Sequence, residues 1–191
     1  VGISYEILVA DDVSTDRTKE ILPQIKGIRY IRNDTNLGFL RNCNQALFFA
    51  RGRNILYLNN DVQVSPGWLH ALLGVFKEHP DAGAVGPKVL YPSGHLQEAG
   101  CSFRHDGTAD MVGLNDDPSS PRYNYLRKVD YVSGVCLLVR GDLLRELGGF
   151  NDEYAPCYCE DSELCLRIRA KGHHVYYAPE SVIVHHLSRT T

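Results

Sequence analysis

Three clusters of acidic and amide side chains stand where a strand-like run ends or a helix-like run begins. The pair Asp11-Asp12 follows an apolar run at residues 6–10, an Asn-Asn-Asp run at residues 59–61 follows a second, and a Glu-Asp pair opens a helical stretch at residues 160–171. Carboxylates can accept hydrogen bonds from a ligand, bind a hard divalent cation or remove a proton from a hydroxyl. Each cluster could therefore take part in binding or catalysis.

Each cluster also has a purely structural interpretation. Asp12 and Asp16 could cap turns and the start of a helix, and Asp61 could be a turn residue. Glu160 and Asp161 could be first-turn acids that complement a helix dipole. Taken singly, none of the three clusters decides between structure and function.

The elements that must position these clusters alternate between strand and helix over the first half of the chain. Strands are expected at residues 6–10, 28–31, 54–58 and 82–91, with helices at 14–25, 36–50 and from Ser65-Pro66 to before Pro80. Such alternation predicts an α/β fold with a mostly parallel central sheet flanked by helices. Ligands of open α/β sheets bind beyond the carboxyl ends of the strands, so the first two clusters could face one crevice.

The second half resumes this pattern after an irregular segment. Residues 92–127 are rich in Gly, Asp, Ser and Pro, which favours binding loops. A strand is expected at 129–139, helices from Asp142 and Glu160, and short strands at 174–177 and 182–185.

Composition narrows the class of protein. The 191 residues are 43% hydrophobic and 23% charged, as is ordinary for a globular protein. They carry 20 Lys and Arg against 23 Asp and Glu, with no strongly basic stretch to bind phosphates, which argues against a nonspecific nucleic-acid binder. No apolar run reaches the ~18–20 residues needed to span a bilayer. Six cysteines in this length are too sparse for a disulfide scaffold and fit a reducing cytoplasm.

A zinc site is the alternative for three of the cysteines. Cys157, Cys159 and Cys165 have the spacing C-x-C-x5-C, with four histidines at residues 173, 174, 185 and 186. Structural zinc sites usually pair two closely spaced cysteines with a second Cys or His pair. The spacing here departs from that pattern, so ordinary buried thiols are the preferred interpretation.

Six segments in one order resemble the motifs of glycosyltransferase family 2. They are VADDVSTDRT (9–18), NLGF (36–39) with Asn44, LNNDV (58–62), residues 134–140 followed by GGFNDE (148–153), CEDSELCLR (159–167), and YAPE (177–180) through His185-His186. The family counterparts are DDxSxD, NxGx…N, the DxD metal motif, GxxxxxR…GGFDE, EDxDLCLR and the closing P…H segment. The resemblance covers nearly the whole chain.

This resemblance implies a GT-A-like nucleotide-diphospho-sugar transferase fold of the rhamnosyltransferase-like branch, as a single domain over residues 1–191. It implies that a nucleotide-diphosphate sugar donor lies across the strand ends. By their match to the motifs, Asp12 contacts the base or ribose with Asp11 beside it, and Asn36, Asn59 and Asn60 lie on the nucleotide.

The resemblance also implies a cation and a base. Asp61 binds Mn²⁺ or Mg²⁺ together with the diphosphate, and His185 adds a nitrogen ligand that suits Mn²⁺ better; a packing role is the alternative for this histidine. Asp161 removes the proton of the acceptor hydroxyl, and Glu160 holds the acceptor or orients Asp161. The family implies inversion at the anomeric carbon by a single displacement.

Three departures from the family pattern bear on these expectations. The metal motif keeps one carboxylate, Asp61, because Asn59 replaces the first acid, and Glu163 stands where the family has a second Asp. The family's opening strand, which ends in Pro-x-x-Asn, and the helix after it are absent ahead of Val1. We therefore expect weak nucleotide-sugar binding by this segment alone, and an unpaired sheet edge that invites a homodimer.

The sequence thus predicts an inverting, metal-dependent glycosyltransferase. Its acceptor is a glycan or a lipid-linked glycan in polysaccharide or cell-surface glycan synthesis, and residues 92–127 shape the acceptor site. The family implies a cytoplasmic protein that can associate with the membrane through segments outside this chain. The alternative is a noncatalytic sugar-nucleotide or glycan-binding module derived from a transferase. A nucleotidyltransferase is disfavoured because no glycine-rich, lysine-containing phosphate loop is present.

Overall fold

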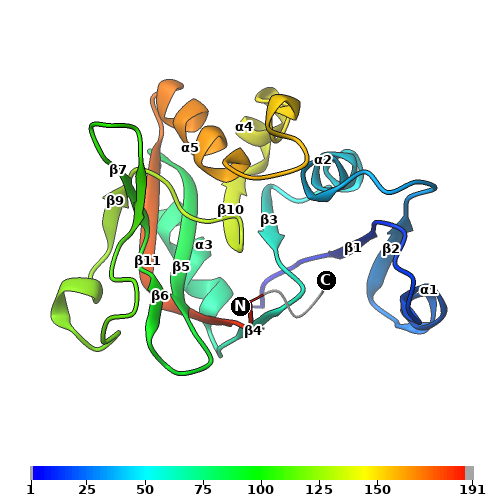
Figure 1. The fold of residues 1–191 in the computed structure, drawn as a ribbon, viewed down its shortest axis with the longest axis horizontal. Coiled ribbons are helices and arrows are strands. Elements are labelled where there is room, and N and C mark those ends of the chain that lie inside the picture. The colour runs from blue at the N-terminus through cyan, green and yellow to red at the C-terminus, as the bar shows by residue number, and fades with distance from the viewer. Residues whose placement is uncertain (1, 188–191) are drawn as a thin grey trace.

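The computed structural model describes residues 2–187, which form a mixed sheet with helices on both faces and two separate strand pairs (Figure 1). The elements in chain order are β1 (Ile7–Asp11), α1 (Thr18–Ile21), a 3-10 turn (Leu22–Gln24), β2 (Ile28–Arg32), α2 (Phe39–Phe49), β3 (Asn54–Leu58), β4 (Val62–Val64), α3 (Trp68–Glu78), β5 (Ala82–Leu90), β6 (Leu96–Glu98), β7 (Cys101–Phe103), β8 (Ala109–Met111), a 3-10 turn (Pro121–Tyr123), β9 (Arg127–Val129), β10 (Cys136–Arg140), α4 (Gly141–Glu146), a 3-10 turn (Asp152–Tyr154), α5 (Glu160–Ala170) and β11 (His174–His185).

The central sheet has seven strands in the order β3-β10-β5-β11-β4, with β6 beside β5 and β9 beside β11. Only β5 and β11 pair in parallel, and the other five pairs of this sheet are antiparallel. The prediction of a mostly parallel sheet is therefore wrong. The physical reason lies after β5, where the chain turns back in hairpins and enters the sheet again as β10, antiparallel to β5. An antiparallel connection of this kind needs no helical crossover.

The strands β1 and β2 form a parallel pair of their own, in register from Ile7 with Ile28 to Asp11 with Arg32. Helix α2 connects this pair to the larger sheet, because Asn42 donates to the Ala10 carbonyl at 3.2 Å while Leu40 packs into the core beside β3. Within the described residues, β1 pairs only with β2 and β3 only with β10. The homodimer expected at an exposed edge stays a prediction.

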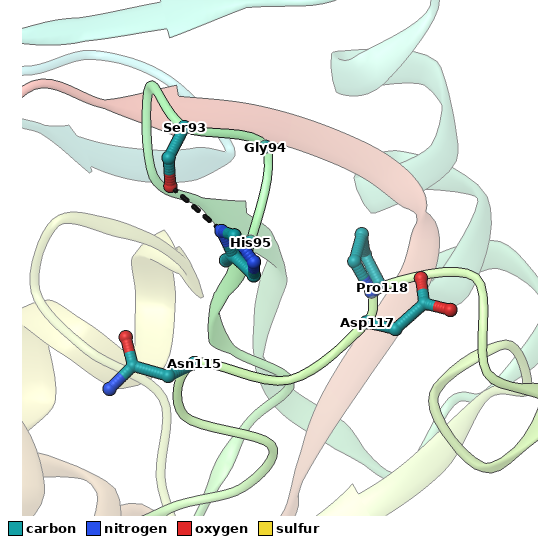
Figure 2. Close-up of a pocket in the computed structure, with 6 residues that line it drawn as sticks. All are labelled: Ser93, Gly94, His95, Asn115, Asp117 and Pro118. Atoms are coloured by element: carbon teal, nitrogen blue, oxygen red, sulfur yellow. Dashed lines mark hydrogen bonds between the residues drawn. The ribbon is translucent and has the colours of Figure 1, made fainter.

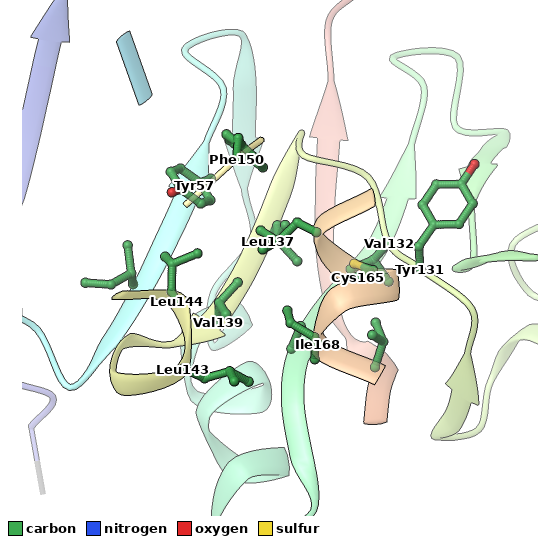
Figure 3. Close-up of a cluster of buried hydrophobic side chains, with 14 of the residues drawn as sticks. Tyr57, Tyr131, Val132, Leu137, Val139, Leu143, Leu144, Phe150, Cys165 and Ile168 are labelled. Carbon is green, nitrogen blue, oxygen red and sulfur yellow. The ribbon is translucent and has the colours of Figure 1, made fainter. Parts of the chain in front are cut away.

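The core has two apolar layers, one on each face of the sheet. Leu137 and Val139 of β10 pack toward α4 and α5, where Tyr57 stacks on Phe150 with ring centroids 4.6 Å apart (Figure 3). The alternate side chain Leu138 faces the other layer, which includes α3. Helix α5 approaches β5 so closely that a Cβ added at Gly83 would lie 2.5 Å from Ile168. The glycine thus permits the close seating of the helix that carries Glu160 and Asp161.

Some elements differ from their predicted bounds for local reasons. Helix α3 begins at Trp68 and not at Ser65-Pro66, because the Ser65 hydroxyl donates to the Val182 carbonyl at 2.6 Å and is used to join β11. The segment 92–127, predicted as loops, holds the short strands β6, β7 and β8. None of the helices within residues 2–187 is both long and apolar enough to cross a membrane.

Candidate active site

Asp61 and His185 meet because β4 pairs antiparallel with β11, with Val62 opposite His185. The His186 amide donates to the Asp61 carbonyl at 2.9 Å and closes this ladder. This pairing also brings the two side chains together. His185 Nε2 lies 3.3 Å from Asp61 Oδ1, and the side chains of His185 and Asp61 are 9% and 8% exposed. Burial lowers the pKa of His185, and the nearby Asp61 carboxylate opposes this.

This pair could hold a divalent cation. Asp61 Oδ1 is buried and has no hydrogen-bond partner in the described part of the chain, and the ring nitrogen 3.3 Å from it is a donor atom for Mn²⁺. Within residues 2–187 no group of three or more His, Cys, Asp or Glu residues converges on one point. Protein sites for Mg²⁺ typically use one or two carboxylates and leave other positions to substrate phosphates and water, so these two donors fit such a cation.

Asn59 and Asn60 lie with Asp61 in the turn that connects β3 to β4. The Asn59 amide donates to the Val135 carbonyl at 3.0 Å, which extends the β3–β10 pairing to the segment 133–135. Asn60 is exposed. Both residues therefore lie beside Asp61, and their contact with a nucleotide stays a prediction.

Asp161 lies in the first turn of α5 and is held by the same 133–135 segment. Its Oδ2 accepts a hydrogen bond from the Gly134 amide at 2.8 Å, and its Oδ1 accepts one from the Ser162 amide at 2.6 Å. Since Val135 contacts Asn59 and Gly134 contacts Asp161, this segment links the turn that carries Asp61 to the predicted base. The two acids that the sequence placed in one site therefore lie at the same part of the sheet.

Glu160 is buried and is 6% exposed, with Oε2 lacking a hydrogen-bond partner. Burial raises its pKa. The charges of Glu160 and Asp12 both add to the burial that raises the pKa of the Cys43 thiol on α2 to about 12. Glu160 thus lies close to α2, and its predicted role toward the acceptor stays a prediction.

Asp11 and Asp12 point to different partners. The Asp11 carboxylate is fully buried and accepts hydrogen bonds from the Ser14 amide, the Tyr30 hydroxyl and Arg32. Burial raises the pKa of Asp11, but these hydrogen bonds outweigh it and hold the pKa at about 2. In this structure Asp11 joins β1 to β2, and the nucleotide contact that the sequence suggested for it stays a prediction.

Asp12 organises the loop before α2. Its carboxylate accepts hydrogen bonds from the Leu37 and Gly38 amides at 2.9 and 2.8 Å and from Asn33 at 2.8 Å. Asn36 Oδ1 also accepts from the Gly38 amide at 3.0 Å. Gly38 has φ +75°, which only glycine adopts readily. The loop is thus preformed, and whether Asp12 and Asn36 also touch a nucleotide stays a prediction.

Three polar residues around the site were given no role by the sequence. Gln97 and Glu98 of β6 are buried and contact His185 and the Ser133 amide at 3.1 Å each. Arg167 ends the matched segment of α5 and donates to the Leu147 and Gly149 carbonyls at 2.8 Å. The position of Arg167 in the motif was a sequence signal that could have pointed to it. The β6 pair carried none, since it lies in a segment predicted as loops.

Glu163, the residue at which the acidic motif departs from the family pattern, has a structural partner. Both of its carboxylate oxygens lie 2.7 Å from the Arg167 guanidinium. This pair fixes the arginine that connects α5 to the turn after α4.

Two cavities lie apart from these residues. One of about 390 Å³ opens within the segment predicted to shape the acceptor site and is lined by Ser93, Gly94, His95, Asn115, Asp117 and Pro118 (Figure 2). A groove of about 590 Å³ lies between α3 and the residues around 124–126 and 178–180. None of the predicted catalytic, nucleotide or metal residues lines either one.

The arrangement just described has counterparts among known proteins. The family model for glycosyl transferase family 2 matches residues 2–148, more than half of the chain. The chain belongs to glycosyl transferase family 2. The family that the motifs indicated is thereby confirmed.

Curated relatives include an O-antigen biosynthesis protein and a rhamnosyltransferase. The chain is 34% identical over 193 residues to the O-antigen biosynthesis protein RfbC of Myxococcus xanthus, covering 96% of this chain and 15% of the relative. It is 29% identical over 208 residues to the N-acetylglucosaminyl-diphospho-decaprenol L-rhamnosyltransferase of Mycobacterium tuberculosis, covering 97% of this chain and 67% of the relative. A further relative, protein y4gI of Sinorhizobium fredii, is matched over 21% of its length. The chain thus spans only a part of several proteins that it resembles.

Solved structures share the fold. GalNAc-T7 with UDP, GalNAc and Mn²⁺ superimposes with a TM-score of 0.76 at 16% identity, over 94% of this chain and 37% of that one. The mannosyltransferase PcManGT of Pyrobaculum calidifontis, with GDP-Man and Mn²⁺, gives 0.68 at 18% identity, over 96% and 48%. The predicted GT-A-like fold is therefore confirmed.

Proposed function

We propose that the protein transfers a sugar from a nucleotide-diphosphate donor to a hydroxyl of a glycan or lipid-linked acceptor, with inversion at the anomeric carbon. The observation that carries this proposal is the 133–135 segment, which joins the Asp61 turn to Asp161. A leaving diphosphate and an attacking hydroxyl need these two acids in one site. Family membership and the two transferases of similar fold support the same function.

The donor is proposed to lie across the ends of β1 and β3. The loop formed by Asp12 and Asn36 borders it on one side, and Asn59 and Asn60 border it on the other. Backbone amides and side-chain amides in such loops can bind base, ribose and phosphate oxygens. The bound nucleotide is identified by comparing UDP- and dTDP-linked donors.

Asp61 and His185 are proposed to hold Mn²⁺ or Mg²⁺. When bound, such a cation neutralises charge that develops on the departing diphosphate. The protein's own part is to keep a carboxylate oxygen and a ring nitrogen 3.3 Å apart at the end of the β4–β11 ladder. Their burial limits access of bulk water to these two donor atoms.

Asp161 is proposed to act as the base. The acceptor oxygen attacks the anomeric carbon and forms the new glycosidic bond, while the bond from that carbon to the diphosphate oxygen breaks and its electron pair leaves with the diphosphate. The proton of the acceptor hydroxyl passes to an Asp161 carboxylate oxygen. The Gly134 amide holds Oδ2 of this carboxylate, and Glu160 is proposed to hold the acceptor or to orient Asp161.

The proposal is tested on the full-length protein that contains this chain, with UDP- and dTDP-linked sugars, L-rhamnose among them, and a lipid-diphosphate N-acetylglucosamine acceptor in the presence of Mn²⁺. We expect release of nucleoside diphosphate and a product whose anomeric configuration, read by NMR, is opposite to that of the donor. Chelation by EDTA should abolish transfer, and added Mn²⁺ should restore it. A product that retains the donor configuration would contradict the single displacement.

The base is tested by Asp161→Asn, which keeps the size of the side chain. A positioned base contributes ~10²–10⁴-fold, so we expect kcat to fall by about that factor while calorimetric binding of the donor is kept. Asp142→Asn, at an exposed position in the first turn of α4, is the matched control and should keep wild-type kcat. Unchanged transfer by Asp161→Asn would remove Asp161 from the role of base, whereas donor binding without any transfer by the wild type would favour a binding module.

A further inference from the structure

Gln97 is a buried amide directed at His185. It is 4% exposed, and its Oε1 lies 3.1 Å from His185 Nδ1. The register of β6 against β5 changes here, since Glu98 pairs with Val89 and Leu96 pairs with Leu90, which leaves Gln97 as the extra residue of a bulge. Bulges redirect the side chain of the extra residue, and this one lies next to the end of β11, which pairs with β5 through Val184 and Leu90.

The contact with Gln97 decides which nitrogen of His185 carries hydrogen. A carboxamide oxygen only accepts hydrogen bonds, so Nδ1 must be the donor. A neutral imidazole has one N–H, which leaves a lone pair on Nε2. Nε2 lies 3.3 Å from Asp61 Oδ1, and this oxygen has no hydrogen-bond partner among residues 2–187.

A lone pair on Nε2 and the Asp61 carboxylate oxygen, 3.3 Å apart, repel each other unless a cation lies between them. In a buried place this repulsion is poorly screened by water. The tautomer set by Gln97 therefore keeps the His185–Asp61 pair open for a cation. The other tautomer would carry hydrogen on Nε2, which would then have no lone pair to offer a cation.

We propose that Gln97 is a positioning residue that holds His185 as the Nδ1–H tautomer, so that Nε2 and Asp61 Oδ1 remain available to a divalent cation. The inference rests on the proposed function, because it assigns the cation to the same pair. Groups that orient a metal-binding histidine typically change metal affinity 10–100-fold when they are removed. Gln97 touches neither the cation nor the substrate in this proposal and acts only through His185.

The first measurement is the tautomer of His185 in the metal-free protein, read from imidazole ¹⁵N chemical shifts in protein labelled at histidine. The His185 signals are assigned by their loss in His185→Asn. We expect the Nδ1–H form in the wild type and in Gln97→Glu, which keeps an accepting oxygen at this position. Gln97→Leu removes the acceptor and should shift His185 to the Nε2–H form. A wild type in which Nε2–H is the main form overturns the proposal.

The second measurement is the affinity for Mn²⁺ in the presence of UDP, followed by electron paramagnetic resonance of the free ion. Gln97→Leu should raise the apparent Kd for Mn²⁺ by about 10–100-fold, and Gln97→Glu should stay close to the wild type. Gln24→Leu, at an exposed position of the 3-10 turn after α1, is the matched control. Thermal melting by circular dichroism shows that each variant is folded.

The outcomes separate this inference from the proposed function. Wild-type affinity in folded Gln97→Leu overturns the role of Gln97 and leaves the cation and the transferase proposal intact. Failure of the wild type to bind Mn²⁺ overturns the cation site, and the inference with it, whereas sugar transfer is judged by its own assay. If Gln97→Leu does not fold, the wild-type tautomer and the Mn²⁺ affinity of Gln97→Glu decide: weakened binding by Gln97→Glu or an Nε2–H wild type overturns the proposal.

Discussion

Glu98 should make the protein less stable as the pH rises, and Glu98→Gln should remove this effect. The side chain is 1% exposed, accepts the Ser133 amide at Oε1 and leaves Oε2 buried with no hydrogen-bond partner. Burial raises the pKa of Glu98 from its ordinary 4.5 to about 7; the Ser133 hydrogen bond lowers this pKa, and the Asp161 charge adds to the rise. Glutamine keeps an accepting oxygen for Ser133 but cannot ionise.

The size of the effect follows from the two pKa values. A rise from 4.5 to about 7 is about 2.5 pKa units, and at about 1.36 kcal/mol each the ionised form costs the folded protein about 3 kcal/mol. Because the folded pKa is the higher one, stability is fully present below the unfolded pKa of 4.5 and is lost as the pH rises through about 7. The loss is under about 1 kcal/mol near pH 5 and about 3 kcal/mol near pH 8.

The assay is urea unfolding of the wild type and Glu98→Gln at both pH values. Between about pH 5 and pH 8, we expect the free energy of unfolding of the variant relative to the wild type to rise by about 2–3 kcal/mol. Any cost of the new buried amide donor is the same at both values and cancels in this difference. Glu78→Gln, at an exposed position at the end of α3, is the matched control and should show no such change, because this side chain lies in water.

A relative stability that is equal at the two pH values would refute this reasoning. It would mean that Glu98 ionises in the folded protein as readily as in the unfolded chain, through a partner or water that lowers the cost of burial. The raised pKa of Glu98, behind the segment that holds Asp161, would then be wrong.

Three further substitutions test contacts around the site. Arg32→Gln should reduce the free energy of unfolding by about 2–3 kcal/mol, because it leaves the buried Asp11 carboxylate without its cation; urea curves that match the wild type would contradict the pairing. In acid, the stabilisation that Asp11 provides should be lost as the pH falls from 3.8 toward about 2. Arg167→Met should lower kcat at least about tenfold with donor KM unchanged. The substitution removes the hydrogen bonds that join α5, which carries Asp161, to the turn after α4, and a small displacement of a catalytic group is costly. A change in KM alone would assign this arginine to donor binding. Phe150→Ala should cost about 3–5 kcal/mol by removing the ring that stacks on Tyr57, and a loss below about 1 kcal/mol in thermal or urea unfolding would show that the core refills the space.

The sequence predicted several elements because their signals are local. The apolar run before Asp11 and the run before Asn59 are the strands β1 and β3, and α5 begins at Glu160 as expected. Periodicity and end signals depend on neighbours a few residues apart, so they can be recognised without the fold. The order of the motifs likewise identified the family before any contact was known.

Other features were missed because they depend on distant partners. Ser65-Pro66 has the composition of a helix start, but the Ser65 hydroxyl binds Val182, and the helix begins later. Gln97 and Glu98 lie in a polar segment that predicts loops, yet pairing with β5 buries them. A local pattern cannot show that a strand from elsewhere will take up a side chain.

What the sequence determined by itself is the set of residue types: acids at the ends of β1 and β3 and at the start of α5, in the order typical of one family. What only the tertiary structure decided is which of these meet. Antiparallel pairing of β4 with β11 places His185 against Asp61, and the return of the chain into β10 places Gly134 against Asp161. Strand direction and register depend on pairing between segments far apart along the chain, and no local periodicity encodes that pairing.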